Sequence, residues 1–185
     1  MQDNITEKIL GGKREYTGVV IDVEHWDVEL PDGKIALREI VLHKGASAVV
    51  PVDENGRVAM VRQYRTPLKR VTLEIPAGKL DTPDEDPFEA AKRELREETG
   101  LSAEKWRKLV ALRTTPGFCN ETIHIYMAQG LSMGETDYDE DEFINVEWIH
   151  IDDLCDRILR GEIEDSKTIA SLMMTREILL RENNL

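Results

Sequence analysis

Three glutamates in the segment PFEAAKRELREETG, residues 87–100, have the side-chain chemistry and the spacing of a metal-binding site. Glu97 and Glu98 follow Glu94 by three and four residues, and these separations place side chains on one face of an α-helix. Carboxylate oxygens are the ligands that hard divalent cations such as Mg²⁺ prefer. For an arbitrary helix of this composition, however, a solvated surface on which neighbouring arginines pair with the acids is the more common arrangement.

A second concentration of acids follows in the segment TDYDEDEF, residues 136–143. Its five carboxylates belong to Asp137, Asp139, Glu140, Asp141 and Glu142. Charges of one sign so close together repel, and a cluster without a partner is normally a solvated loop. A bound cation would reverse that cost. The segment is therefore a candidate contributor to the same site.

The acidic segment also begins like an EF-hand calcium loop, with aspartates at alternate positions. The sixth position of such a loop is glycine and the twelfth is a bidentate glutamate, whereas this chain has Glu142 and Trp148 there. The flanking segments favour strands, where an EF-hand has helices. We therefore reject a calcium loop of this type.

The segment that carries the three glutamates is predicted to be a helix. Pro87 stands where the first turn tolerates proline, and Gly100 stands where a helix commonly stops. Phe88, Ala91 and Leu95 form an apolar stripe separate from the glutamates, which suits packing on a core. The helix would thus present its acids on one side and its apolar residues on another.

Strands are expected on both sides of this helix. Before it, two strands surround the turn LPDGK within residues 17–43, a hairpin-like unit joins residues 46–52 and 58–65 around DENGR, and a further short strand covers residues 71–78. After it come strands at residues 108–115, 121–129 and 143–151, then helices at 151–159 and 166–181. This order predicts an α+β layered domain rather than a doubly wound sheet.

The chain as a whole has the composition of one soluble domain. Its 185 residues are enough for a single domain with a good core, and no apolar run approaches the roughly 20 residues that span a bilayer. The net charge of −13 argues against nucleic acid or an anionic membrane as a partner, since both are bound by basic residues. The N-terminus lacks a signal pattern, so Cys119 and Cys155 are expected to be free thiols in a reducing cytoplasm.

The segment GKLDTPDEDPFEAAKRELREETGL, residues 78–101, resembles the signature of the Nudix hydrolases, which are pyrophosphohydrolases of nucleoside diphosphates linked to another group. The matching positions are Gly78, Glu85, Arg93, Glu94, Leu95, Glu97, Glu98, Gly100 and Leu101. Six residues rather than the usual five separate Gly78 from Glu85, and we place the extra residue in the DTPD turn, where an insertion is cheap. The resemblance implies an α/β/α sandwich with a mixed sheet and an N-terminal antiparallel β element.

Segments outside the signature resemble the ADP-ribose pyrophosphatase branch of that family. These are IPAGKLD before the helix and TTPGFCNETIHIYMAQGL after it, in which Pro116 lies fifteen residues beyond Leu101. The resemblance implies hydrolysis of ADP-ribose to AMP and ribose 5-phosphate with Mg²⁺, or Mn²⁺ in its place. Two alternatives remain open. One is another nucleoside diphosphate sugar, such as a GDP- or UDP-sugar, and the other is a non-catalytic module that senses ADP-ribose.

The resemblance also implies roles for the acids. Glu94 and Glu98 would bind the metal directly, Glu97 would bind it or position water, and the carbonyl of Ala77 would complete the coordination. Arg93 would orient a glutamate. A carboxylate beside the attacking water would act as the base or as an additional metal ligand. The resemblance favours Glu142 for this role, with Glu140 as the alternative.

The candidate substrate-binding residues are Trp26, Arg38, Arg65, Glu74, Pro116 and Gly117. Trp26 would stack on adenine or fill the core of a hairpin, and Arg65 would bind a phosphate or lie on the surface. For Arg38 a surface role is favoured. Glu74 would contact the terminal ribose or face water. His25, His43, His124 and His150 lack metal-site spacing and are expected to be structural.

The resemblance further implies a homodimer. Residues 1–44 would form a β element that packs on the partner and brings Trp26 to the partner's adenine site, and residues 45–185 would form the hydrolase domain.

Overall fold

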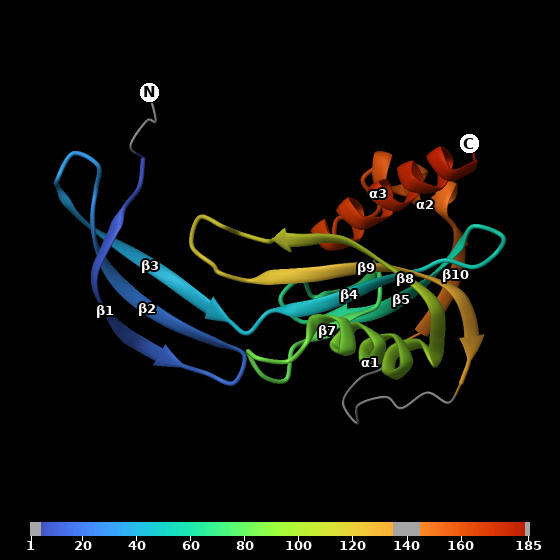
Figure 1. Ribbon diagram of the computed structural model, residues 1–185, viewed down its shortest axis with the longest axis horizontal. Coiled ribbons are helices and arrows are strands. Elements are labelled where there is room, and N and C mark those ends of the chain that lie inside the picture. Colours follow the sequence, from blue (N-terminus) through green and yellow to red (C-terminus); the bar gives the residue numbers. More distant parts are fainter. Residues whose placement is uncertain (1–4, 135–144, 184–185) are drawn as a thin grey trace.

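The computed structural model describes residues 5–134 and 145–183, whose strands form three sheets (Figure 1). The first sheet contains β1 (Lys8–Thr17), β2 (Ile21–Glu29) and β3 (Ile35–His43). The second has the order β10-β5-β6, from β5 (Arg57–Arg65), β6 (Arg70–Glu74) and β10 (Asn145–His150). The third has the order β7-β4-β9-β8, from β4 (Ala46–Pro51), β7 (Ala77–Lys79), β8 (Leu101–Arg113) and β9 (Thr122–Met133).

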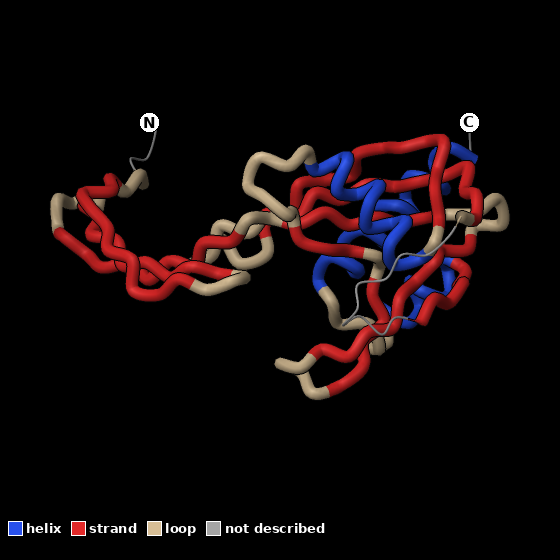
Figure 2. Tube along the Cα trace, turned by 90° about the horizontal axis from the view of Figure 1, so that it is seen from below, coloured by secondary structure: helices blue, strands red, loops and turns tan. Residues whose placement is uncertain are grey.

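The N-terminal sheet is antiparallel throughout and extends away from the body of the molecule (Figure 2). Strands β2 and β3 match the predicted pair around LPDGK. Strand β1 was not predicted. The sheet is tied to the body near the end of β3, where the Val41 N–H donates to the Phe118 carbonyl at 2.7 Å and the Val41 carbonyl accepts from the Asn120 N–H at 3.2 Å.

Residues 46–52 and 58–65 were expected to pair as a hairpin, and this prediction is wrong except next to the turn. Val52 and Val58 form a single bridge there, but β4 and β5 then separate into different sheets. Every residue of β4 is buried, and this strand pairs in parallel with β9 and antiparallel with β7. Because β4 is fully covered by these partners and by both helical layers, β5 pairs with β6 and β10 instead.

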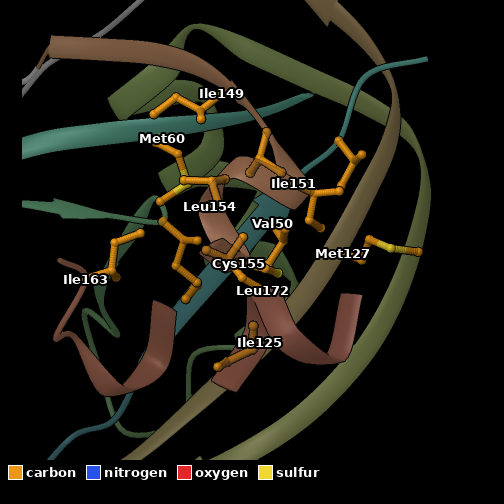
Figure 3. Close-up of a cluster of buried hydrophobic side chains, with 14 of the residues drawn as sticks. Val50, Met60, Ile125, Met127, Ile149, Ile151, Leu154, Cys155, Ile163 and Leu172 are labelled. Atoms are coloured by element: carbon orange, nitrogen blue, oxygen red, sulfur yellow. The ribbon is translucent and has the colours of Figure 1, made fainter. Parts of the chain in front are cut away.

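Helices cover the two faces of the body, which confirms the predicted α/β/α layering. Helix α1 (Pro87–Thr99) packs its Leu95 with Val49 and Tyr126 on one face. Helices α2 (Ile151–Leu159) and α3 (Ser166–Asn183) place Leu154 and Leu172 in the larger cluster on the other face, together with the residues labelled in Figure 3. Successive residues of β4 point to opposite faces, as strand geometry requires, so one strand serves both clusters.

Helix α1 begins and ends at the residues that its sequence predicted. The Asp86 side chain accepts the N–H groups of Phe88 and Glu89, with Pro87 in the first turn. Gly100 ends the helix with φ of 70°, a left-handed conformation that glycine adopts without a side-chain clash. Helix α2 matches residues 151–159, and α3 extends the predicted 166–181 by two residues. Among the described residues, no helix is both long and apolar enough to cross a membrane.

Candidate active site

The glutamate face of α1 lies against β7, the short strand that begins within the IPAG segment. Glu94 and Glu98 are 7% and 2% exposed, and the Glu98 carboxylate accepts the N–H of Ala77 at 2.9 Å. A Cβ added to Gly78 would lie 2.1 Å from the Glu94 carboxylate. With any other residue at position 78, the Glu94 carboxylate would have to move away from the main chain, which gives Gly78 a physical reason for its place in the sequence.

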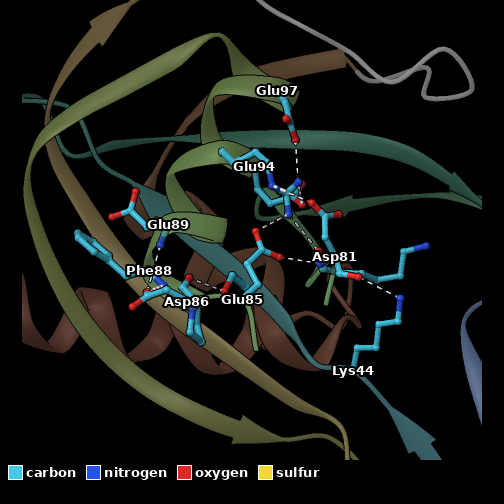
Figure 4. A network of polar contacts seen from close by, with 12 residues as sticks. Lys44, Asp81, Glu85, Asp86, Phe88, Glu89, Glu94 and Glu97 are labelled. Atoms are coloured by element: carbon cyan, nitrogen blue, oxygen red, sulfur yellow. Dashed lines mark hydrogen bonds and ion pairs between the residues drawn. The ribbon is translucent and has the colours of Figure 1, made fainter. Parts of the chain in front are cut away.

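Arg93 lies among acids of the helix and the preceding loop, and the acids Asp81, Glu85, Glu94 and Glu97 are labelled in Figure 4. Its guanidinium donates to Glu94 at 2.7 Å, to Glu97 at 2.9 Å and to the Lys79 carbonyl at 3.2 Å. Burial alone would lower the pKa of Arg93, but the negative charges of Glu94, Asp81 and Glu97 outweigh it and hold that pKa above its usual value. The arginine thus stays charged and fixes the orientation of two glutamates.

The loop between β7 and α1 accommodates its extra residue without displacing Glu85. One Glu85 oxygen accepts the Asp81 N–H at 2.6 Å, and the other lies 3.4 Å from the Arg93 guanidinium. The Asp81 carbonyl in turn accepts from Lys44 at 3.0 Å (Figure 4). Glu85 therefore links the turn that contains Asp81 to Arg93 on α1.

The donor set suits a hard divalent cation. Glu94 and Glu98 bring buried carboxylates to the Ala77–Gly78 main chain, and carboxylate and carbonyl oxygens are the ligands that Mg²⁺ prefers. Within the described ranges, no group of three acidic, histidine or cysteine side chains is arranged to hold a metal. The Arg93 guanidinium donates hydrogen bonds to both Glu94 and Glu97.

A cavity of about 340 Å³ opens beside this part of the site. We call it the β7 cavity, and it is lined by Ala46, Gln63, Arg65, Ala77, Gly78, Lys79, Glu121, Ile123 and Lys167. Three of these residues are cationic and one is acidic, in a chain whose net charge is −13. The cavity is therefore a suitable place for an anionic group that lies next to the glutamate face.

Arg65 reaches the β7 cavity, whereas Glu74 lies behind it as a buried anchor. Glu74 is 3% exposed and accepts two hydrogen bonds from Arg65, at 2.9 and 2.7 Å, one from Thr72 at 2.6 Å, and one from Lys167. Burial would raise the pKa of Glu74, but Arg65 and Lys167 lower it to about 2. The water-facing alternative for Glu74 is wrong, because its carboxylate is committed to these partners.

Sequence reasoning missed Lys167, which is 7% exposed and lies in the first turn of α3. The neighbouring Thr168 accepts the N–H of Ile75 at 3.0 Å. The start of α3 is therefore hydrogen-bonded to the β6–β7 segment just before Ala77 and Gly78. One signal was available in the sequence, since a lysine in the first turn of a helix opposes the helix dipole and calls for a specific reason.

Trp26 and Arg38 are not brought to α1 within one chain. They face each other as register partners in β2 and β3, in the sheet that extends from the body (Figure 1). The Trp26 indole N–H donates to Glu24 at 2.7 Å, and the Arg38 guanidinium pairs with Glu7. Both side chains therefore belong to a surface of the N-terminal sheet.

Pro116 and Gly117 lie in the loop between β8 and β9. That loop bonds to β3 through Phe118 and Asn120, and its last part brings Glu121 to the β7 cavity. It therefore connects the N-terminal sheet with the candidate site. The two loop candidates Glu140 and Glu142 lie outside the described residues.

The histidines that were expected to be structural include two with clear local roles. His43 Nδ1 accepts the N–H of Gly45 at 3.0 Å, and His150 Nδ1 accepts the N–H of Asp152 at 3.2 Å, which caps α2. Both rings stabilise turns at the ends of strands.

Comparison with known proteins places this geometry in a family. The sequence model of the NUDIX domain matches residues 41–172. A protein named ADP-ribose pyrophosphatase from Bacillus subtilis is 44% identical over 167 residues, which cover 89% of this chain and 90% of the relative. A protein named methanol dehydrogenase activator from Bacillus methanolicus is 42% identical over 168 residues, which cover 90% of each chain.

A solved structure supports the same assignment of the fold. The crystal structure of an ADP compounds hydrolase matches with a TM-score of 0.84 over 97% of both chains, at 23% sequence identity. At that identity the similarity concerns the fold, N-terminal sheet included, since nearly the whole chain is matched.

Proposed function

The chain belongs to the Nudix family, and from this premise we propose that it hydrolyses ADP-ribose to AMP and ribose 5-phosphate in a reaction that requires Mg²⁺. The observation that carries the proposal is the buried pair Glu94 and Glu98, held against the Ala77–Gly78 main chain. The similarity to the Bacillus subtilis ADP-ribose pyrophosphatase over 89% of the chain supports this substrate. The name of the Bacillus methanolicus relative states no substrate.

Nudix hydrolases generally use divalent metal ions. In the proposed site, Glu94, Glu98 and the Ala77 carbonyl would hold the metal, and Glu97 would bind it or position water. When bound there, Mg²⁺, or Mn²⁺ in its place, would supply positive charge that offsets the phosphate oxygens and makes water more acidic. Arg93 keeps Glu94 and Glu97 oriented through its two short hydrogen bonds. Arg65, at the wall of the β7 cavity, binds a phosphate of the substrate.

A base is needed beside the attacking water, and the carboxylates of α1 are committed to the metal and to Arg93. Glu142 supplies this base or an additional metal ligand in our proposal, with Glu140 as the alternative. Single substitutions distinguish these residues from their neighbours. Glu142→Gln or Glu140→Gln should lower kcat roughly a hundredfold or more, whereas Asp139→Asn and Asp141→Asn should change it little. Unchanged rates in all four variants would move the role of base to Glu97.

The protein is proposed to act as a homodimer in which residues 1–44 pack on the partner and Trp26 reaches the partner's adenine site. The apolar side chains that the N-terminal sheet leaves exposed support this, among them Ile9, Leu10, Ile35 and Leu37. Large exposed apolar patches commonly mark interfaces. Light scattering of the active protein at micromolar concentration tests the proposal, and an active monomer would contradict it.

The free thiols Cys119 and Cys155 fit a cytoplasmic location.

A substrate panel tests the proposed activity directly. The purified protein is assayed with Mg²⁺ against ADP-ribose, GDP- and UDP-sugars and nucleoside triphosphates, and the nucleotide and phosphate products that each substrate releases are detected, which for ADP-ribose are AMP and ribose 5-phosphate. ADP-ribose should be cleaved, and a chelator should abolish the reaction. Faster turnover of another nucleoside diphosphate sugar would change the substrate assignment. Tight binding of ADP-ribose without turnover would favour a sensing module instead.

A further inference from the structure

The charged residues around Glu74 are sorted between two cavities. The cations Arg65 and Lys167 line the β7 cavity. The acids of the same ion-pair cluster, Glu74 and Asp165, line a different cavity of about 520 Å³ between β6 and the segment that joins α2 to α3, a cavity that three arginines also line. The ion-pair cluster thus separates the two spaces, with its positive groups toward the candidate active site and its negative groups on the other side.

Lys167 is fixed in this position by the two acids. Its ammonium group donates to Glu74 and, at 3.1 Å, to Asp165. Asp165 also accepts the N–H of Thr168 at 2.9 Å and so caps the first turn of α3. An ammonium group has three N–H donors, and these two acids account for two of them. One donor therefore remains for a group inside the β7 cavity.

Stability alone does not account for a lysine at this place. A buried ion pair commonly contributes no more stability than apolar residues of similar volume would. A cation in the first turn of a helix is also disfavoured by the helix dipole. Arg65 already pairs with Glu74 through two hydrogen bonds, so the carboxylate would be compensated without Lys167. A lysine that lines the β7 cavity at this position is explained if it also binds an anion there.

We infer that Lys167 is a substrate-binding residue that contacts a phosphate group in the β7 cavity, beside Arg65. The identity of the ligand as a diphosphate ester rests on the proposed function, whereas the anion site itself rests on the cavity and its cations. Glu74 and Asp165 are positioning residues, because they hold the two cations from the side opposite to the ligand.

Binding of inorganic pyrophosphate tests the anion site without catalysis. Isothermal titration calorimetry is performed in the presence of a chelator on the full chain and on three variants. Lys167→Gln should weaken binding about tenfold, the effect of losing one charged hydrogen bond. Asp165→Asn should tighten binding, because it removes a negative charge beside Lys167, while asparagine still caps the helix. Lys105→Gln, at an exposed position of β8, controls for the loss of one positive charge.

The opposite signs expected for Lys167→Gln and Asp165→Asn separate a binding role from a structural one. If Lys167 only stabilised the fold, both variants would unfold at lower temperature and neither would bind pyrophosphate differently. Should Lys167→Gln fail to fold, Asp165→Asn still decides. Undetectable binding by the unmodified protein, or equal affinities in all variants that fold, would overturn the inference.

Kinetics with ADP-ribose then tie the anion site to the reaction. Lys167→Gln should raise KM more than it lowers kcat, and Lys167→Arg, which keeps the charge, should restore most of the affinity. A normal KM in Lys167→Gln would overturn the inference and leave the proposed function intact. If pyrophosphate binding depended on Lys167 but the protein did not cleave ADP-ribose, the anion site would stand and the proposed function would be wrong.

Discussion

Glu98 combines deep burial with a hydrogen bond to main chain that is itself part of the proposed site. Replacing it by glutamine keeps the side-chain shape and removes the charge that a metal ligand supplies. We expect Glu98→Gln to lower kcat by several orders of magnitude, measured with saturating Mg²⁺ and ADP-ribose. Glu89→Gln, at an exposed position of the same helix, is the matched control. If the two variants had similar kcat values, Glu98 would not be a metal ligand and α1 would have only a structural role.

At the scale of residues, the sequence predicted the glutamate face but not its surroundings. Offsets of three and four residues suffice to place Glu94, Glu97 and Glu98 on one side of a helix. The partners of Glu74 come from β5, β6 and α3, and a contact with a residue 93 positions away leaves no periodic pattern in the sequence. Burial of Glu74 and Lys167 could therefore be learned only from the folded chain.

One of the buried hydrogen bonds that join helix α3 to the β6–β7 segment can be removed with little change in volume. Thr168 is fully buried, and its hydroxyl accepts the Ile75 N–H at 3.0 Å. Thr168→Val should cost about 1–3 kcal/mol of unfolding free energy, because the N–H remains buried without a partner. Urea denaturation measures this cost. Thr168→Ser keeps the hydroxyl and should lose less stability. If it lost as much unfolding free energy as Thr168→Val, packing of the methyl group would be the dominant contribution.

At the scale of elements, local signals worked where caps or turns are strong. Helix α1 has Asp86 and Gly100 at its ends, and both ends were predicted. Strand β1 was missed because all of its residues are exposed and two glycines interrupt it, so it shows no alternation of apolar and polar residues. The division of β4 and β5 between two sheets depends on pairing with distant strands, which a turn signal such as DENGR does not specify.

The stability of the whole molecule should depend on pH through Glu74. Its pKa is about 2 in the folded protein, against 4.5 for the unperturbed group. A carboxyl group with a lowered pKa contributes its stability above the unfolded value and loses it as pH falls through the folded value. We expect a loss of about 3 kcal/mol between roughly pH 4.5 and pH 2 from this group alone.

Urea denaturation at a series of pH values measures this dependence, with Glu74→Gln as the comparison. The variant should be less stable at neutral pH, because Arg65 and Lys167 lose their buried counter-charge. Its stability should also fall less steeply below pH 4.5. Parallel curves for the two proteins would show that other acids control the acid transition.

The separation of the N-terminal sheet from the glutamate face has a consequence for cells that express two different mutant chains together. Trp26 belongs to the sheet formed by β1, β2 and β3, and Glu98 belongs to α1 in the body. If one chain lends its Trp26 to the site of the other, two defective proteins can complement each other. A heterodimer of Trp26→Ala and Glu98→Gln chains would contain one site with both residues intact. Random pairing of co-expressed chains should then restore about a quarter of the normal activity, whereas sites built within single chains would restore none.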